Sequence, residues 1–164
     1  LTRQKVPVLP RESVYRDGEI FRGAYILEEA RGGAPEMILA ASGSEVHVAL
    51  EARKSLEAQG IPTRVVSFPC WERFEEQPEE YRDKVFPPSV EARVSVEAAS
   101  VFGWERYVGR PGASVGIDRY GASAPGTKVL AELGINPENV VARAKAVLAG
   151  IAAKGGAGKK GRVA

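Results

Sequence analysis

The sequence predicts an α/β protein, a three-layer α/β/α domain on a mostly parallel mixed sheet of about five strands. Short apolar runs alternate along the chain with longer segments of helical periodicity. The run at 37–41 is short and continuously apolar, which is typical of a strand buried on both faces. A helix and a second strand follow it, in a length that suits a right-handed parallel crossover. The chain of 164 residues is long enough for one domain with a sizeable core.

The first expected strand covers residues 23–28, and the second covers 37–41. Ser42 and Glu45 have the spacing of a capping box, in which each side chain satisfies a free backbone N–H at a helix start. This helix is expected to run to Gln59 and to stop at Gly60, because glycine accepts the left-handed conformation after a last turn. The next strand is expected at 63–68.

The second half of the chain repeats the alternation with shorter helices. Its expected elements are helices in 70–77 and 78–86, a strand at 92–98, a helical turn within 100–109, a strand at 113–117 and a helix over 125–133. Asn136 is expected to cap the last helix, with Pro137 at its first position. Six apolar residues of that helix share one face, as in a helix that covers a sheet: Val140, Val141, Ala144, Val147, Leu148 and Ile151.

Bulk composition narrows the function classes. The formal net charge is +2 and the last eleven residues hold four basic side chains without an acid, so the tail from residue 151 is expected to be flexible. Neither the charge nor the aromatic residues, which are mixed with acids, suggests a nucleic-acid partner. No apolar run reaches the length of a membrane span. One cysteine excludes an internal disulfide and fits a reducing compartment.

The residues alone do not predict a catalytic site. His47 is the single histidine, and we interpret it as a solvated side chain with Glu51 as its surface partner, against the alternative of a general base. Cys70 follows a strand and is interpreted as a passive, half-buried thiol, against the alternative of a nucleophile. Ser123, in GIDRYGASAPG, is expected to cap a helix, although such a helix start could bind an anion. No residues are spaced as metal ligands.

Several segments together resemble successive signatures of transketolase, in the family's order and over nearly the whole chain to about Gly150. They are LTRQKVPVL, GAYILEEARGGAPEMILAASGSEV, RVVSFPCWERFEEQPEEYRDKVFPP, VSVEAASVFGWERYVG and GIDRYGASAP. The part they resemble is the C-terminal domain plus the closing strand of the middle, pyrimidine-binding domain. The resemblance divides the chain into 1–10, the end of that preceding domain, a linker at 11–22, the C-terminal domain at 23–150 and a Gly/Lys-rich tail at 151–164.

In this resemblance, Arg3 matches the family's arginine that holds the phosphate of the sugar substrate, and a guanidinium fork suits that contact. Thr2 stands where serine is usual, Lys5 where asparagine is usual, and Cys70 where serine is common. Arg3 is the one active-site residue that carries over. The family's cofactor ligands, metal ligands and catalytic histidines belong to domains that precede this segment, and the missing initiator methionine fits a segment cut from a longer chain.

The resemblance implies a cytoplasmic, homodimeric enzyme of the pentose phosphate pathway that moves a two-carbon ketol unit from a ketose phosphate to an aldose phosphate. Thiamine diphosphate and a divalent cation, Mg²⁺ or Ca²⁺, would serve the intact enzyme, and this chain alone would be inactive and support the dimer. Two alternatives stay open. One is a related thiamine enzyme, a dihydroxyacetone synthase or a deoxyxylulose-phosphate synthase. The other is an interaction or regulatory module without catalytic domains.

Overall fold

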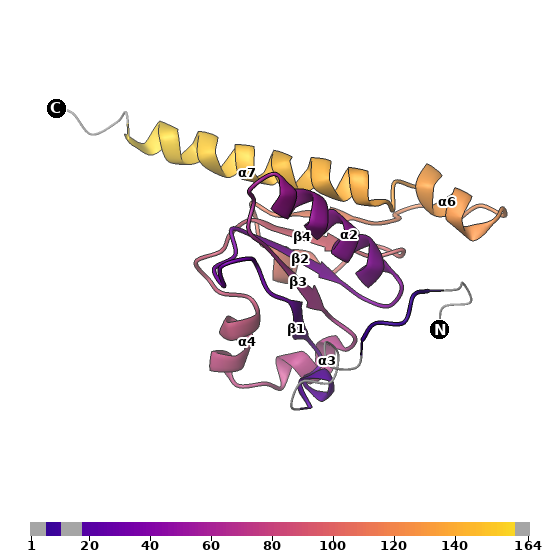
Figure 1. The fold of residues 1–164 in the computed structure, drawn as a ribbon, viewed down its shortest axis with the longest axis horizontal. Helices are drawn as coiled ribbons and strands as arrows, with labels where there is room; N and C mark the ends of the chain where they lie inside the picture. The colour runs from indigo at the N-terminus through magenta and orange to yellow at the C-terminus, as the bar shows by residue number, and fades with distance from the viewer. Residues whose placement is uncertain (1–5, 11–17, 160–164) are drawn as a thin grey trace.

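The computed structural model describes residues 6–10 and 18–159, and these residues form a mixed five-stranded sheet covered on both faces (Figure 1). The strand order is β1-β3-β2-β4-β5. β1 pairs antiparallel with β3, and the other neighbours are parallel. The strands are β1 (Tyr25–Glu28), β2 (Met37–Ala41), β3 (Thr63–Ser67), β4 (Arg93–Val96) and β5 (Ala113–Val115). The predicted fold class is confirmed.

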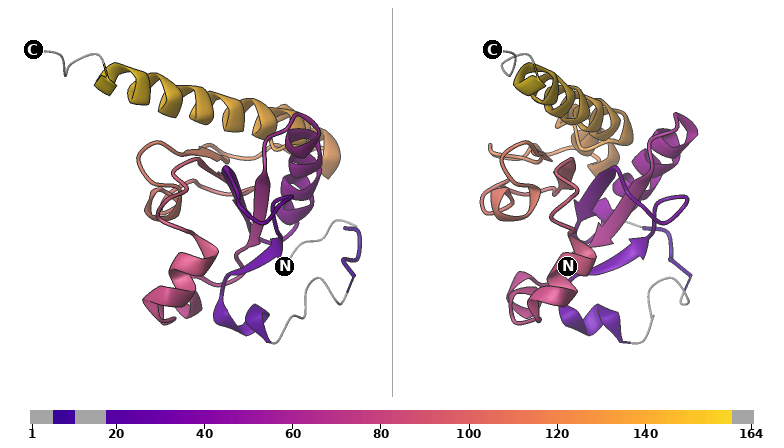
Figure 2. Two further views of the ribbon diagram at one scale, coloured as in Figure 1. Left: turned by 60° about the vertical axis from the view of Figure 1, so that its left-hand side comes forward. Right: turned by 90° about the vertical axis from the view of Figure 1, so that its left-hand side faces the viewer.

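Two long helices, α2 (Glu45–Ala58) and α7 (Pro137–Lys159), cover one face of the sheet. The short helices lie on the other side or at the ends, as Figure 2 shows. They are η1 (Glu19–Arg22), α3 (Trp71–Glu75), α4 (Glu79–Val85), α5 (Glu105–Val108) and α6 (Gly126–Glu132). The layers follow from strand periodicity, since Met37 and Leu39 face the α2–α7 core while Ile38 and Ala40 face the other core. β2 is buried at all five positions.

The expected elements are present, although most are one to a few residues shorter than expected, and the end of α2 shows how a local signal fixes a limit. Gly60 has a φ of 78° and donates its N–H to the Glu57 carbonyl at 3.1 Å. The Ile61 N–H bonds to the Leu56 carbonyl at 3.0 Å. These two bonds form a Schellman motif, so the predicted stop at Gly60 is confirmed. At the start of α7, the Asn139 N–H donates to Asn136 Oδ1 at 2.9 Å, which confirms the predicted cap.

Two helix starts were predicted wrongly. The hydroxyl of Ser42 does not cap α2 but donates to Glu97 Oε2 at 2.6 Å, and the N-cap position is Ser44, which makes no side-chain capping bond. A partner 55 residues away has displaced the local capping box. The N-cap of α6 is Pro125, so Ser123 does not cap that helix either. In both cases the N-cap lies two residues after the serine that was expected to cap the helix.

The expected tail is helical over much of its length. α7 continues to Lys159, although the segment from residue 151 was expected to be flexible. Extending an existing helix costs less than nucleating a new one, which counters the poor helix propensity of the three glycines in residues 151–159. Residues 160–164 lie outside the described residues, as do 1–5 and 11–17. In Figure 1 the yellow end of α7 extends past the sheet, and residues 152–155 are exposed.

Candidate functional site

The proposed phosphate-binding residue, Arg3, lies outside the described residues, so its position stays a prediction. The segment that follows it is described from Val6 to Pro10 and is largely exposed. Val8 is 96% exposed, whereas Leu9 packs against the core on the α2–α7 side. Leu9 therefore anchors this segment to the domain a few residues after Arg3.

Polar side chains meet where two neighbouring strands, β2 and β4, end. Ser42 directly follows β2 and Glu97 directly follows β4, and their side chains share the 2.6 Å hydrogen bond. From here the chain leaves in opposite directions, because β3 lies on one side of the β2–β4 pair and β5 on the other. Ligands of open α/β sheets commonly bind at such a switch point, beyond the carboxyl ends of the strands. This edge is therefore the first candidate site.

The electrostatics of this edge involve two carboxyl groups. Burial raises the pKa of Glu97, the nearby charge of Glu45 raises it further, and the Ser42 hydroxyl partly offsets both effects. Glu45 itself is buried and accepts a hydrogen bond from the Ser44 hydroxyl at 2.5 Å. The edge can thus donate and accept hydrogen bonds.

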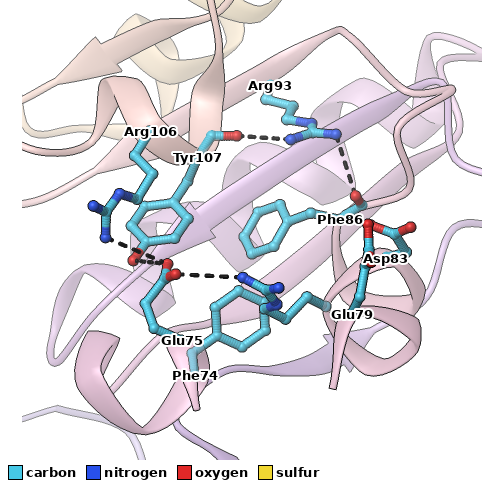
Figure 3. A pocket seen from close by; sticks show the side chains of 9 residues that line it. Phe74, Glu75, Glu79, Asp83, Phe86, Arg93, Arg106 and Tyr107 are labelled. Carbon is cyan, nitrogen blue, oxygen red and sulfur yellow. Dashed lines mark hydrogen bonds and ion pairs between the residues drawn. The ribbon is translucent and has the colours of Figure 1, made fainter. Parts of the chain in front are cut away.

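The second candidate is an open pocket of about 430 Å³ between α3, α4 and α5, shown in Figure 3. Glu75 lines this pocket and accepts a hydrogen bond from the Tyr107 hydroxyl at 2.8 Å. Arg82 Nη1 lies 3.4 Å from the same carboxylate, and Arg106 Nη1 lies 3.6 Å from it. Three acids and three arginines line the pocket, so its formal charges cancel: Glu75, Glu79, Asp83, Arg82, Arg93 and Arg106.

Arg93 closes one wall of this pocket with hydrogen bonds to backbone carbonyls. Its guanidinium donates to the carbonyls of Val90, Phe86, Pro87 and Tyr107, at 2.7 to 3.3 Å. Burial lowers the pKa of Arg93, although Asp83 and Glu91 act in the opposite direction. Arg93 therefore ties the loop between α4 and β4 to α5, and these bonds commit most of its donors to the protein. Among the described side chains, the Nε of Arg82 is a buried nitrogen without a hydrogen-bond partner.

Tyr107 cannot act as a base in this pocket near neutral pH. Burial, and then the Glu75 carboxylate, raise its pKa to about 12. Its ring instead packs edge-on against Phe68 at 4.6 Å and Trp71 at 5.3 Å between ring centroids. Five aromatic residues lie in or against the hydrophobic core on this face of the sheet: Trp71, Phe74, Tyr81, Trp104 and Tyr107. The pocket is therefore lined by charged side chains that lie over an aromatic core, and this core holds α3, α4 and α5 in position.

The residues weighed as catalytic candidates are not brought together. His47 is half-buried on α2, and its expected partner Glu51 pairs with Lys54 at 2.7 Å. Cys70 is half-buried before α3, and its thiol donates to Glu72 Oε2 at 3.4 Å. Within residues 6–10 and 18–159, no group of three or more histidine, cysteine or acidic side chains could hold a metal ion. No helix in the same ranges is long and apolar enough to cross a membrane.

Comparison with known proteins identifies the class of protein to which this fold and its two candidate sites belong. Residues 23–136 match the model of the transketolase-like TK C-terminal domain family. A transketolase from Geobacillus stearothermophilus is 49% identical over 148 residues, which is 90% of this chain and 22% of that protein. A Leishmania mexicana transketolase structure is 41% identical, has a TM-score of 0.70 and is matched over 77% of this chain and 18% of its own.

A transketolase mutant structure from Pichia stipitis has a TM-score of 0.78 at 36% identity, over 89% of this chain and 20% of its own. The class is thus the transketolase-like C-terminal domain. The chain belongs to the transketolase family and corresponds to the C-terminal part of its members. It spans about a fifth of the length of the relatives that it matches. The switch-point pair and the charged pocket described above are features of this domain.

Proposed function

We propose that this chain is the C-terminal part of a transketolase that moves a two-carbon ketol unit from a ketose phosphate to an aldose phosphate. The observation that carries the proposal is the 49% identity to a transketolase over 90% of this chain. Solved Pichia stipitis transketolases contain xylulose 5-phosphate, fructose 6-phosphate or sedoheptulose 7-phosphate, so phosphorylated ketoses are the proposed donors. The relatives named above are transketolases, which disfavours the two alternative thiamine enzymes.

The cofactor of the proposed reaction does not fit the residues described here. Thiamine diphosphate supplies an electron sink and needs a divalent cation to hold its diphosphate. The described residues provide no cluster of metal ligands, and the switch-point edge carries carboxyl groups that would repel a diphosphate. We therefore assign the cofactor and the metal to the preceding domains. Arg3 is the residue of this chain proposed to reach the substrate, where it would bind the sugar phosphate.

Exposed aromatic side chains mark where this domain would meet the preceding domains. Phe102 is 84% exposed and Tyr120 is 98% exposed, in the loops that follow β4 and β5. Asp118 ties the two loops together by accepting the Ser100 hydroxyl and the Val101 N–H, each at 3.0 Å. A pair of aromatic side chains held outward in this way favours an interface. Because relatives are about five times longer, we assign this surface to the rest of a dimeric transketolase.

We further propose a cytoplasmic enzyme, since the free thiol of Cys70 fits a reducing compartment.

The test of the proposed ketol transfer is a chimera in which residues 1–164 replace the matching segment of the Geobacillus stearothermophilus transketolase. It should transfer ketol units from xylulose 5-phosphate in the presence of thiamine diphosphate and Mg²⁺. Phe102→Ser with Tyr120→Ser should weaken its assembly, whereas Arg31→Ser, at an exposed turn, should not. A chimera that dimerises and binds cofactor but transfers no ketol unit would refute the proposal.

A further inference from the structure

Three basic side chains line one groove beside α7, and no acidic side chain lines it. Arg143 and Lys154 belong to α7, and Arg110 belongs to the turn between α5 and β5. The groove has a volume of about 220 Å³. The remaining lining residues are small or apolar: Pro111, Ala113, Ala146, Val147, Gly150 and Ile151. It lies at the amino end of β5, whereas Ser42 and Glu97 lie beyond the carboxyl ends of β2 and β4, at the opposite end of the parallel strands.

Among the residues that the structure describes, no acidic side chain forms an ion pair with any of these three cations. Other cations of the chain are paired, such as Arg64 with Glu29 and Lys84 with Glu19, each at 2.8 Å. The ion pairs found in the described ranges do not involve Arg110, Arg143 or Lys154. The low overall charge of +2 therefore conceals a local concentration of positive charge.

The spacing of the charges suits a ligand with more than one anionic group. Arg143 and Lys154 are eleven residues apart, so they lie on the same face of the helix, about 16 Å apart along its axis. Arg110 faces them from the turn before β5. The long side chains can fold inward from both ends, but one small monoanion cannot contact all three. Between them the helix face carries Ala146 and Gly150, and a Cβ placed on Gly150 would meet no atom within 4 Å.

We propose that this groove binds a small metabolite with two or more phosphate charges, whose carbon skeleton lies on the apolar floor of Pro111, Val147 and Ile151. Arginine and lysine supply charge-assisted hydrogen bonds to phosphate oxygens. The volume is below that of sites for drug-sized ligands and suits a compact ligand. The proposal does not rest on the proposed ketol transfer, because none of the groove residues is assigned to that reaction.

The test is a titration of the 164-residue chain with pyrophosphate at low ionic strength, followed by NMR of backbone amides. Saturable shifts should concentrate at residues 110–113 and 143–154, at submillimolar to millimolar concentration. Arg143→Ala and Lys154→Ala should each weaken binding about 2- to 5-fold, as expected for exposed charge pairs. Lys145→Ala is the matched control, since Lys145 is exposed on the same helix but does not line the groove.

Gly150→Leu separates shape from charge, because it fills the groove and leaves all three cations in place. It should weaken pyrophosphate binding at least 5-fold while the circular dichroism spectrum is unchanged. The proposal is overturned if Lys145→Ala weakens binding as much as Lys154→Ala, or if Gly150→Leu has no effect. It is also overturned if sulfate at equal ionic strength competes as well as pyrophosphate, since that result means an adventitious ion only.

Discussion

Arg3 is expected to hold a phosphate group that is remote from the reacting carbon. A contact made equally in the ground and transition states changes KM and leaves kcat nearly unchanged. In the chimeric enzyme, Arg3→Ala should therefore raise KM for sugar phosphates about 10- to 150-fold, from a charge-assisted bond of about 1.5–3 kcal/mol. Arg3→Lys should recover part of this loss, because charge is kept and the fork is lost.

Unphosphorylated substrates provide the control for Arg3 in steady-state kinetics. They should respond little to either substitution. If Arg3 is instead part of a structural ion pair at a domain junction, both classes of substrate will be affected alike and stability will fall. That outcome would overturn the assignment.

Glu97 should make the stability of the domain depend on pH. Its pKa is raised in the folded state, mainly by burial, so between its unfolded and folded pKa values the native state binds more protons than the unfolded state. Stability should then fall as pH rises from about 4 through the folded pKa. Glu97→Gln keeps an acceptor for the Ser42 hydroxyl and removes the charge, so it should be more stable than the parent at pH 7.

Urea denaturation at pH 4 and pH 7 measures this effect. The control is Glu51→Gln, since Glu51 is exposed and pairs with Lys54 at the surface. The advantage of Glu97→Gln should shrink at pH 4, where the parent carboxyl group is largely protonated in both states. An advantage of equal size at both pH values would show that the charge of Glu97 is not its cause.

At the scale of elements, glycines on two helices should respond in opposite directions to the same change. Gly60 ends α2 at a φ of 78° with open space around its Cβ position, so Gly60→Ala should cost about 1–2 kcal/mol from backbone strain alone. Gly150 lies inside α7, also with open space around its Cβ position. Gly150→Ala should therefore raise the free energy of unfolding by about 0.5–1 kcal/mol. Chemical denaturation of both variants tests the pair, and changes of the same sign would contradict it.

Elements whose signals are local could be predicted from the sequence. The continuous apolar run of β2 gave its limits at Met37 and Ala41, and Gly60 and Asn136 marked helix ends by their own backbone or side-chain chemistry. Local patterns predicted wrongly where the outcome depends on a residue that is distant in the sequence. Ser42 has suitable cap spacing, but Glu97 takes its hydroxyl, and no local pattern contains that information.

The same limit applies to the candidate sites. Glu75, Arg82 and Tyr107 come from three helices that local patterns predicted, yet their meeting in one pocket depends on how those helices pack. A usable signal did exist for the switch point, since Ser42 and Glu97 are the first polar residues after two buried strands. The groove at α7 had a weaker one, the eleven-residue spacing of Arg143 and Lys154 on one helix face.

For the whole molecule, we expect this chain alone to bind no thiamine diphosphate at micromolar concentration and to transfer no ketol units. The described residues supply no metal-ligand cluster for the magnesium complex of the cofactor. Calorimetric titration with thiamine diphosphate and Mg²⁺ should show no saturable micromolar heat. A parallel titration of Lys154→Ala identifies any weaker heat that comes from the groove at α7. Micromolar, magnesium-dependent binding by both chains would contradict the assignment of the cofactor to preceding domains.

The strand order has a consequence for how the chain folds. β1 comes before β2 in the sequence but pairs with β3, so Tyr25 of β1 can pair only after Ser67 of β3 is in place. β2 and β3, in contrast, are joined directly through α2. Closing the longer loop costs more entropy before any contact repays it. We expect the β2–α2–β3 unit to form first and to leave the outer edge of β3 open to other chains until β1 docks. Pulsed hydrogen exchange during refolding should therefore protect the amides of β2 and β3 before those of β1, and protection of β1 first would mean that the sheet grows from its antiparallel edge.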